Sequence, residues 1–148
     1  MSETIEKFKL TLKELMELKN IGIGELAKEL HTSRFVIHRW LTSAKDMRIN
    51  SLLKIADYFQ CSVEFLCGRT DEYLGFEPKE IPPFSDWLKN VLAECDKSAY
   101  QLFRDTKIMP TQMHQWKYHT QPMLNNLVII ADYLGVTLDY LIGRDRSR

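Results

Sequence analysis

Hydrophobic residues recur along the chain at the three- and four-residue spacing of amphipathic helices, and the pattern indicates no strands. In the first half, this spacing predicts helices over about residues 8–20, 23–30 and 34–41, a fourth after Asn50 and a short one after Ser62. The side chains expected to point inward are Phe8, Leu12, Leu15, Met16, Ile37, Trp40, Leu52, Ile55, Ala56 and Phe59. The pattern therefore predicts an all-α fold, with five helices in about 60 residues.

The same pattern occurs twice along the chain. Residues 8–40 align with 84–116 at an offset of 76, and residues 50–69 align with 125–144 at an offset of 75, with nine identities in the 20 positions of the second alignment. A period this long indicates a duplicated domain rather than a solenoid. We expect domains at 1–70 and 84–148, joined by a linker at 71–83 that holds three of the five prolines.

Polar residues mark the expected helix starts. Ser33 is placed to cap the third helix, while Ser98 and Gln101 have the spacing of a capping box at the second helix of the repeat. Asn50 and Asn125 are the expected caps of the fourth helix in each copy. The last short helices are expected to begin at Ser62 and Thr137.

The run IGIGELAKELHTSRFVIHRW (21–40), followed by SLLKIADYFQCSVEFLCGRTD (51–71), resembles the phage repressor and Cro family of lambda-repressor-like, Xre-type helix-turn-helix domains. The resemblance covers about residues 10–70 and again 86–144, and so implies two tandem copies. It implies that 23–30 is the positioning helix and 33–41 the recognition helix, laid in the major groove of double-stranded DNA. The family often has glycine at the turn position held here by His31, a residue type that tolerates positive φ.

A cationic face accompanies the expected recognition helix. From residue 28 to 48 there are five basic and two acidic side chains, although the whole chain is neutral, with 20 of each sign. The expected DNA-binding residues of this copy are Ser33, Arg34, Phe35, His38 and Arg39, with Lys28, Lys45 and Arg48 around them. Arg34 and Arg39 are the expected base readers and Ser33 a phosphate contact. Phe35 has two open interpretations: contact with a thymine methyl, or packing beneath a neighbouring loop or domain.

The second copy departs from the family pattern. Phe103 replaces Ala27 where two helices cross, and Met109-Pro110 replaces Ser33-Arg34. We expect the larger ring to separate or re-angle the helices. The candidate DNA contacts that remain are Thr111, Gln112, His114, Gln115 and Lys117. Either this copy reads a different half-site or it has become a structural partner.

Several function classes are disfavoured. The longest apolar run has five residues where a membrane span needs about 20, and the N-terminal segment lacks a signal-peptide core, so a cytoplasmic protein is expected. Three cysteines at irregular spacing, with Cys61 and Cys67 aligned to core positions, indicate neither disulfides nor zinc. No catalytic motif is present, so we expect no enzyme, metal or cofactor.

Two hypotheses about the function remain. The first is a sequence-specific transcriptional regulator, most simply a repressor that occupies an operator. The second is a protein-interaction module, such as an antirepressor or antitoxin-like partner, that keeps the fold without reading DNA. The aromatic residues of helices four and five, Tyr58 and Phe65 in the first copy and Tyr133 and Tyr140 in the second, either complete each small core or form an interface. If they form an interface, the copies make an intramolecular pseudo-dimer with half-sites roughly 10 base pairs apart. The alternative assembly is a homodimer of the chain.

Overall fold

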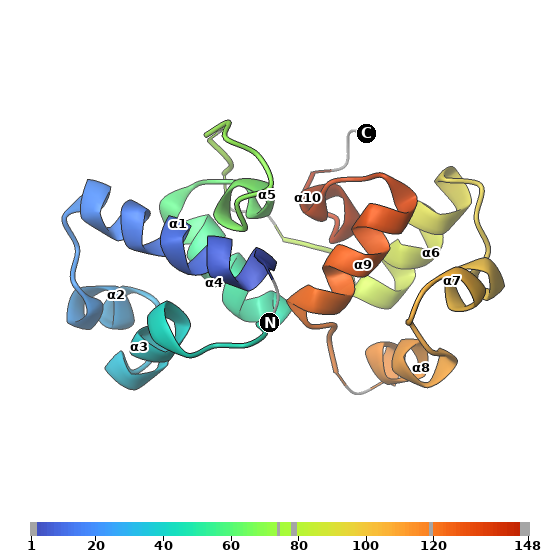
Figure 1. Ribbon diagram of the computed structural model, residues 1–148, viewed down its shortest axis with the longest axis horizontal. Helices are drawn as coiled ribbons and strands as arrows, with labels where there is room; N and C mark the ends of the chain where they lie inside the picture. Colours follow the sequence, from blue (N-terminus) through green and yellow to red (C-terminus); the bar gives the residue numbers. More distant parts are fainter. Residues whose placement is uncertain (1–2, 74, 78–79, 119, 146–148) are drawn as a thin grey trace. The chain divides into compact units, whose positions relative to one another are not determined.

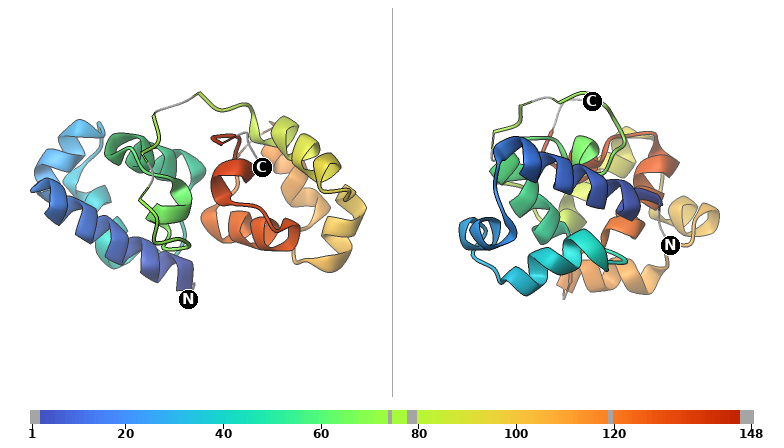
Figure 2. Two further views of the ribbon diagram at one scale, coloured as in Figure 1. Left: turned by 90° about the horizontal axis from the view of Figure 1, so that it is seen from above. Right: turned by 60° about the vertical axis from the view of Figure 1, so that its left-hand side comes forward.

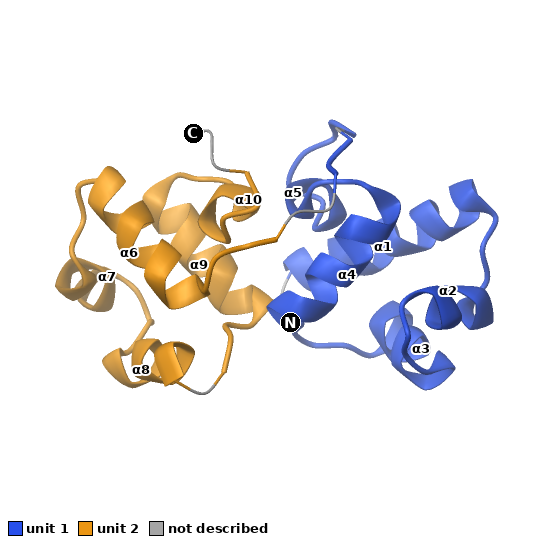
Figure 3. Cartoon of the chain, turned by 180° about the vertical axis from the view of Figure 1, so that it is seen from behind, with its two compact units in different colours: residues 1–78 blue, residues 79–148 orange. Residues whose placement is uncertain are grey.

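The computed structural model describes residues 3–73, 75–77, 80–118 and 120–145, which form ten α-helices (Figure 1). The chain divides into two compact units, residues 1–78 and 79–148 (Figure 3). This boundary falls within the expected linker at 71–83, of which residues 74, 78 and 79 lie outside the described residues, as do 1, 2 and 146–148 at the ends. The helical composition agrees with the expected all-α class.

Unit 1 contains five helices. They are α1 (Glu3–Lys19), α2 (Ile23–Glu29), α3 (Arg34–Thr42), α4 (Ile49–Phe59) and α5 (Val63–Leu66). Helix α1 forms because Phe8, Leu12 and Leu15 share one buried face, and this face packs on α3 and α5 (Figure 2). None of the described helices has the length and hydropathy needed to cross a membrane.

Unit 2 has the same order of elements. They are α6 (Phe84–Glu94), α7 (Ala99–Asp105), α8 (Pro110–Tyr118), α9 (Leu124–Leu134) and α10 (Leu138–Leu141). Helices α7 and α8 begin and end 76 residues after α2 and α3, and α9 and α10 begin and end 75 residues after α4 and α5. The helix boundaries therefore follow the offsets of the sequence alignment.

Most of the predicted caps are present. The Ser33 hydroxyl oxygen accepts a hydrogen bond from the Val36 amide at 3.2 Å, Ser98 and Gln101 form the capping box, and Ser62 and Thr137 cap α5 and α10. The prediction for Asn50 and Asn125 is wrong. The caps of α4 and α9 are Arg48 and Met123, so each asparagine lies within the first turn. The first residues of these helices, Ile49 and Leu124, are fully buried, and their burial outweighs a side-chain cap.

Each unit also contains an acid–arginine ion pair with the same five-residue spacing. In unit 1, Glu64 Oε1 lies 3.0 Å from Arg69 Nε, with side-chain exposures of 14% and 21%. In unit 2, Asp139 Oδ1 lies 3.1 Å from Arg144 Nη1, and the corresponding exposures are only 3% and 0%. Only the second pair is buried, so only that pair has lost nearly all of its hydration.

Candidate nucleic-acid interface

The helix-turn-helix motif of unit 1 (residues 23–42) is closed by a tight turn. His31 adopts φ 56°, as its place in the turn predicts, and the Thr32 amide donates a hydrogen bond to the Ala27 carbonyl at 2.9 Å. Ala27 is buried, and its small side chain lets α2 and α3 pack closely. The turn therefore fixes α3 relative to α2.

Helix α3 has one buried and one exposed face. Ile37 and Trp40 are buried behind it, and at its end the Lys9 Nζ of α1 donates a hydrogen bond to the Thr42 carbonyl at 3.3 Å. Lys9 was not among the expected functional residues, because the pattern of α1 gives no sign of a contact 33 residues away. With the back and the end held, the outer face of α3 is a fixed surface.

The structure places the expected DNA-binding residues of unit 1 on this surface or beside it. All eight are exposed: Ser33, Arg34, Phe35, His38 and Arg39 at the start and outer face of α3, Lys28 on α2, and Lys45 and Arg48 in the segment between α3 and α4. Phe35 is 75% exposed, so the interpretation that it packs beneath a loop is wrong. The arrangement places two arginines and an exposed aromatic ring on one helix. In protein–DNA complexes, arginine can hydrogen-bond guanine and an apolar ring can contact the thymine methyl group.

The corresponding segment of unit 2 (residues 99–118) is built differently. Its turn has no left-handed residue among the described positions, and Thr106 is extended instead. The Thr106 hydroxyl donates to the Leu102 carbonyl at 2.6 Å and accepts from the Ile108 amide at 3.1 Å. Phe103 is half-buried, and α7 and α8 pack less closely than α2 and α3, as the larger ring predicts.

Helix α8 contributes no buried side chain. Its main described anchor is Trp116, whose ring meets that of Phe84 edge-on at 5.6 Å. Of the expected contact residues, Thr111, His114, Gln115 and Lys117 are exposed and Gln112 is half-buried. The Gln112 Oε1 accepts a hydrogen bond from the Met109 amide at 2.8 Å, so this side chain caps the helix, a role that the sequence analysis did not assign to it.

A polar cluster joins α7 to α9 in unit 2. Arg104 donates two hydrogen bonds to Asp105, at 2.8 and 3.0 Å, and the Tyr133 hydroxyl donates to Asp105 Oδ2 at 2.7 Å. These bonds lower the pKa of Asp105 from 3.8 to about 2, and Arg104 makes a larger contribution than Tyr133. The bond to Asp105 in turn raises the pKa of Tyr133.

Replacing Tyr133 with phenylalanine is expected to raise the pKa of Asp105 and to weaken unit 2 near neutral pH. A carboxyl group with a lowered pKa in the folded state stabilises the fold above its unfolded pKa of 3.8, and this contribution disappears as the pH falls from there towards 2. The variant should therefore show a smaller loss of thermal stability between these pH values than the wild type. An NMR titration of the Asp105 carboxyl carbon measures the shift directly, and an unchanged midpoint would contradict the assignment.

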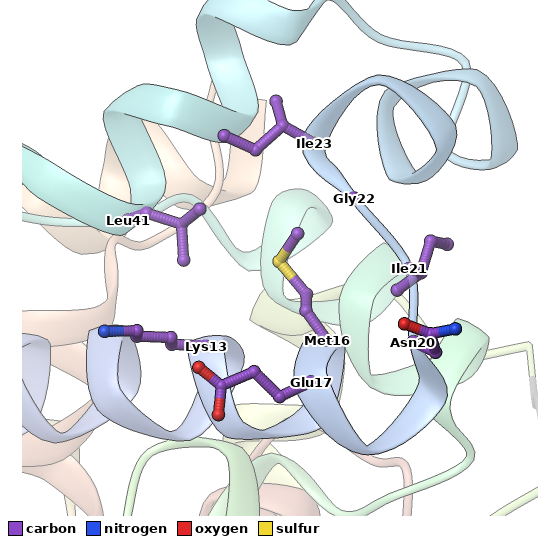
Figure 4. A pocket seen from close by; sticks show the side chains of 8 residues that line it. All are labelled: Lys13, Met16, Glu17, Asn20, Ile21, Gly22, Ile23 and Leu41. Carbon is purple, nitrogen blue, oxygen red and sulfur yellow. The ribbon is translucent and has the colours of Figure 1, made fainter.

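A shallow groove of about 350 Å³ lies beside the motif of unit 1 (Figure 4). Met16, Ile23 and Leu41 supply apolar lining from three helices, and α1 adds Lys13 and Glu17. Across the described segments, no three histidine, cysteine or acidic side chains lie close enough together to hold a metal ion. The groove lies between α1, α2 and α3.

Residues 11–72 match the family model of the Cro/C1-type HTH DNA-binding domain. The match covers less than half of the chain, but it contains the helix-turn-helix motif of unit 1 with its exposed arginines. It supports the resemblance of unit 1 to the Xre-like helix-turn-helix family, and it supports a DNA-binding transcription regulator as the general class of the protein. Comparisons with curated proteins and with solved structures found no match.

Proposed function

We propose that the protein is a sequence-specific repressor that inserts α3 into the major groove of an operator. The observation that carries this proposal is the pair Arg34 and Arg39, exposed on a helix whose back is fixed by Ile37 and Trp40. An arginine can donate two hydrogen bonds to O6 and N7 of guanine, and a helix of this kind fits the major groove. The protein acts in this proposal by occupying DNA and not by catalysis.

The other exposed groups around α3 complete the proposed interface. Phe35 can pack on a thymine methyl, and the Ser33 hydroxyl, which accepts from the Val36 amide, still has a proton to donate to a phosphate. Lys28, Lys45 and Arg48 add positive charge near the phosphate backbone. In this proposal the outer face of α3 contacts the bases, while the start of α3 and the cations around it contact the phosphates.

Selection of binding sites from random double-stranded DNA by the full chain tests the proposal. We expect a defined motif, with affinity that falls steeply as salt rises. Arg39→Ala should weaken binding by about 1–3 kcal/mol and relax the preference at one base pair. Lys54→Ala, an exposed cation on α4, is the matched control and should change affinity little. If no motif is selected, or if both variants lose affinity equally at every base, the proposal is wrong.

A second function is proposed for unit 2, where three exposed side chains favour protein binding. Tyr100, Met109 and Tyr118 are large, apolar and exposed on or next to α7 and α8. Exposed aromatic and methionine side chains are enriched in protein interfaces. The sequence repeat supports a second helix-turn-helix domain in unit 2, but its α8 offers Gln115 where α3 offers Arg39.

The same DNA selection distinguishes the roles of unit 2. If α8 reads DNA, the selected motif contains two half-sites and Gln115→Ala relaxes one of them, most directly an adenine contact. If unit 2 binds protein, the motif has the length of one half-site per chain, and Gln115→Ala leaves it unchanged. The first result would also favour pairing of the two units on DNA over a homodimer of the chain.

A further inference from the structure

We propose that Gly24 is a specificity-determining residue that acts by positioning the guanidinium group of Arg34. This inference rests on the proposed function, in which Arg34 contacts DNA. Gly24 belongs to α2 and Arg34 is the first residue of α3, so the contact joins the two helices of the motif. The absence of a side chain at residue 24 provides the space that the guanidinium group occupies.

The geometry shows how closely the two residues approach. A Cβ atom built on Gly24 would lie 2.8 Å from Nη2, 2.9 Å from Nε and 3.0 Å from Cζ of Arg34. All three atoms belong to the planar guanidinium group, and the separations to the two nitrogens are shorter than real Cβ atoms essentially ever show. The guanidinium group therefore rests against the backbone of α2 and cannot keep this position beside any residue larger than glycine.

Glycine is otherwise unfavourable at this position. It lies in the first turn of α2 and does not have a positive φ, so no backbone requirement explains its presence. Alanine has a higher helix propensity, and the three atoms nearest to a methyl group here all belong to the end of a flexible side chain. Alanine at residue 24 is compatible with the fold, but it is not compatible with the observed position of the Arg34 side chain.

The repeat supplies an independent observation. At the corresponding positions of unit 2, Tyr100 stands for Gly24 and Pro110 stands for Arg34. Proline has no guanidinium group that needs space, and the tyrosine there is exposed. Unit 2 therefore contains neither member of the pair.

The consequence for DNA reading is preorganisation. A free arginine side chain loses much rotamer freedom when it makes a bidentate contact, and a side chain already held against α2 loses less. A fixed guanidinium group also addresses one base pair rather than several. Gly24 thereby contributes to affinity and to sequence preference through Arg34, without a side chain of its own.

The experiment compares Gly24→Ala with Gly22→Ala in the full chain. A Cβ built on Gly22 has no neighbouring atom within 4 Å, and Figure 4 shows that Gly22 lies in the connection just before α2. We expect Gly24→Ala to lower affinity for the selected site about fivefold or more, the low end of the range for a bidentate base contact, with no fall in Tm. Gly22→Ala should leave the affinity within about twofold of wild type.

The same substitutions in an Arg34→Ala background isolate the cause. There, Gly24→Ala should have no further effect on affinity, since the group that it displaces is absent. If Gly24→Ala still weakens binding in that background, residue 24 approaches the DNA directly and the proposal is wrong. It is also wrong if Gly24→Ala binds as tightly as the wild type.

A measurement without DNA separates this inference from the proposed function. The NMR resonance of the Arg34 Nε–H group in the free protein should move on Gly24→Ala and stay in place on Gly22→Ala. An unchanged resonance in Gly24→Ala would overturn the positioning role. Failure of the wild-type chain to select any DNA site would instead overturn the proposed function on which the role depends.

Discussion

Asp139→Asn is expected to lower the unfolding free energy of unit 2 by about 3–5 kcal/mol, the cost of breaking a buried ion pair. The substitution keeps the size of the side chain but removes the charge that faces Arg144, which is fully buried 3.1 Å away. Arg144 then loses the charge of this partner in the interior of unit 2. The backbone carbonyl of residue 139 accepts hydrogen bonds from the Arg144 and Asp145 amides, and the substitution leaves this acceptor in place.

Amide hydrogen exchange measures this effect separately in each unit. Glu64→Gln is the matched control, because Glu64 and Arg69 form the same kind of pair in unit 1 but remain partly hydrated. Glu64→Gln should lower the free energy of unfolding less than Asp139→Asn does, because the remaining arginine of a partly hydrated pair is still partly solvated. Equal losses of protection in the two variants would show that burial does not set the contribution of these pairs.

Trp40→Ala is expected to lower the free energy of unfolding of unit 1 by about 3–5 kcal/mol, the usual range for removing a large aromatic side chain from a core. Trp40 is 5% exposed, and with Ile37 it forms the buried face of α3. Its loss would leave a cavity behind the helix that presents Arg34 and Arg39. DNA binding should therefore fall together with stability.

The same substitution at Trp116 should cost much less. Trp116 is half-buried and belongs to α8, none of whose side chains is fully buried. The loss of its edge-on contact with the Phe84 ring removes about 0.5–1.5 kcal/mol beyond the area that it buries. Urea unfolding of both variants, followed by amide signals of each unit, makes the comparison. A larger loss at Trp116 than at Trp40 would contradict the difference between α3 and α8.

The helical skeleton could be predicted from the sequence because local patterns determine it. The spacing of Phe8, Leu12 and Leu15, the Ser33 cap and the positive φ of His31 all depend on residues close together in the chain. The starts of α4 and α9 were misassigned by the same reasoning. There, the burial of Ile49 and Leu124 decides the boundary, and burial is a property of the folded unit.

The exposed residues of the candidate interface were also predictable, since helical periodicity separates them from Ile37 and Trp40. What could not be predicted are contacts between elements. The space that Gly24 leaves for Arg34 and the bond from Lys9 to the end of α3 both require knowledge of how helices meet. The Gln112 cap is local, because it joins a side chain to the amide three residues earlier, and its spacing from Met109 is the signal that was missed. A glycine inside a short helix was a sign of such a contact, but the sequence does not name the partner.

Helix α8 has a consequence for how this protein can change over evolutionary time. Because none of its side chains is fully buried, substitutions along most of its length carry little folding cost. Helix α3 is more constrained, since Ile37 and Trp40 belong to the core. Within one chain, the surface of α8 can therefore change with little effect on the folding of unit 2, whereas the core of unit 1 limits how α3 can change.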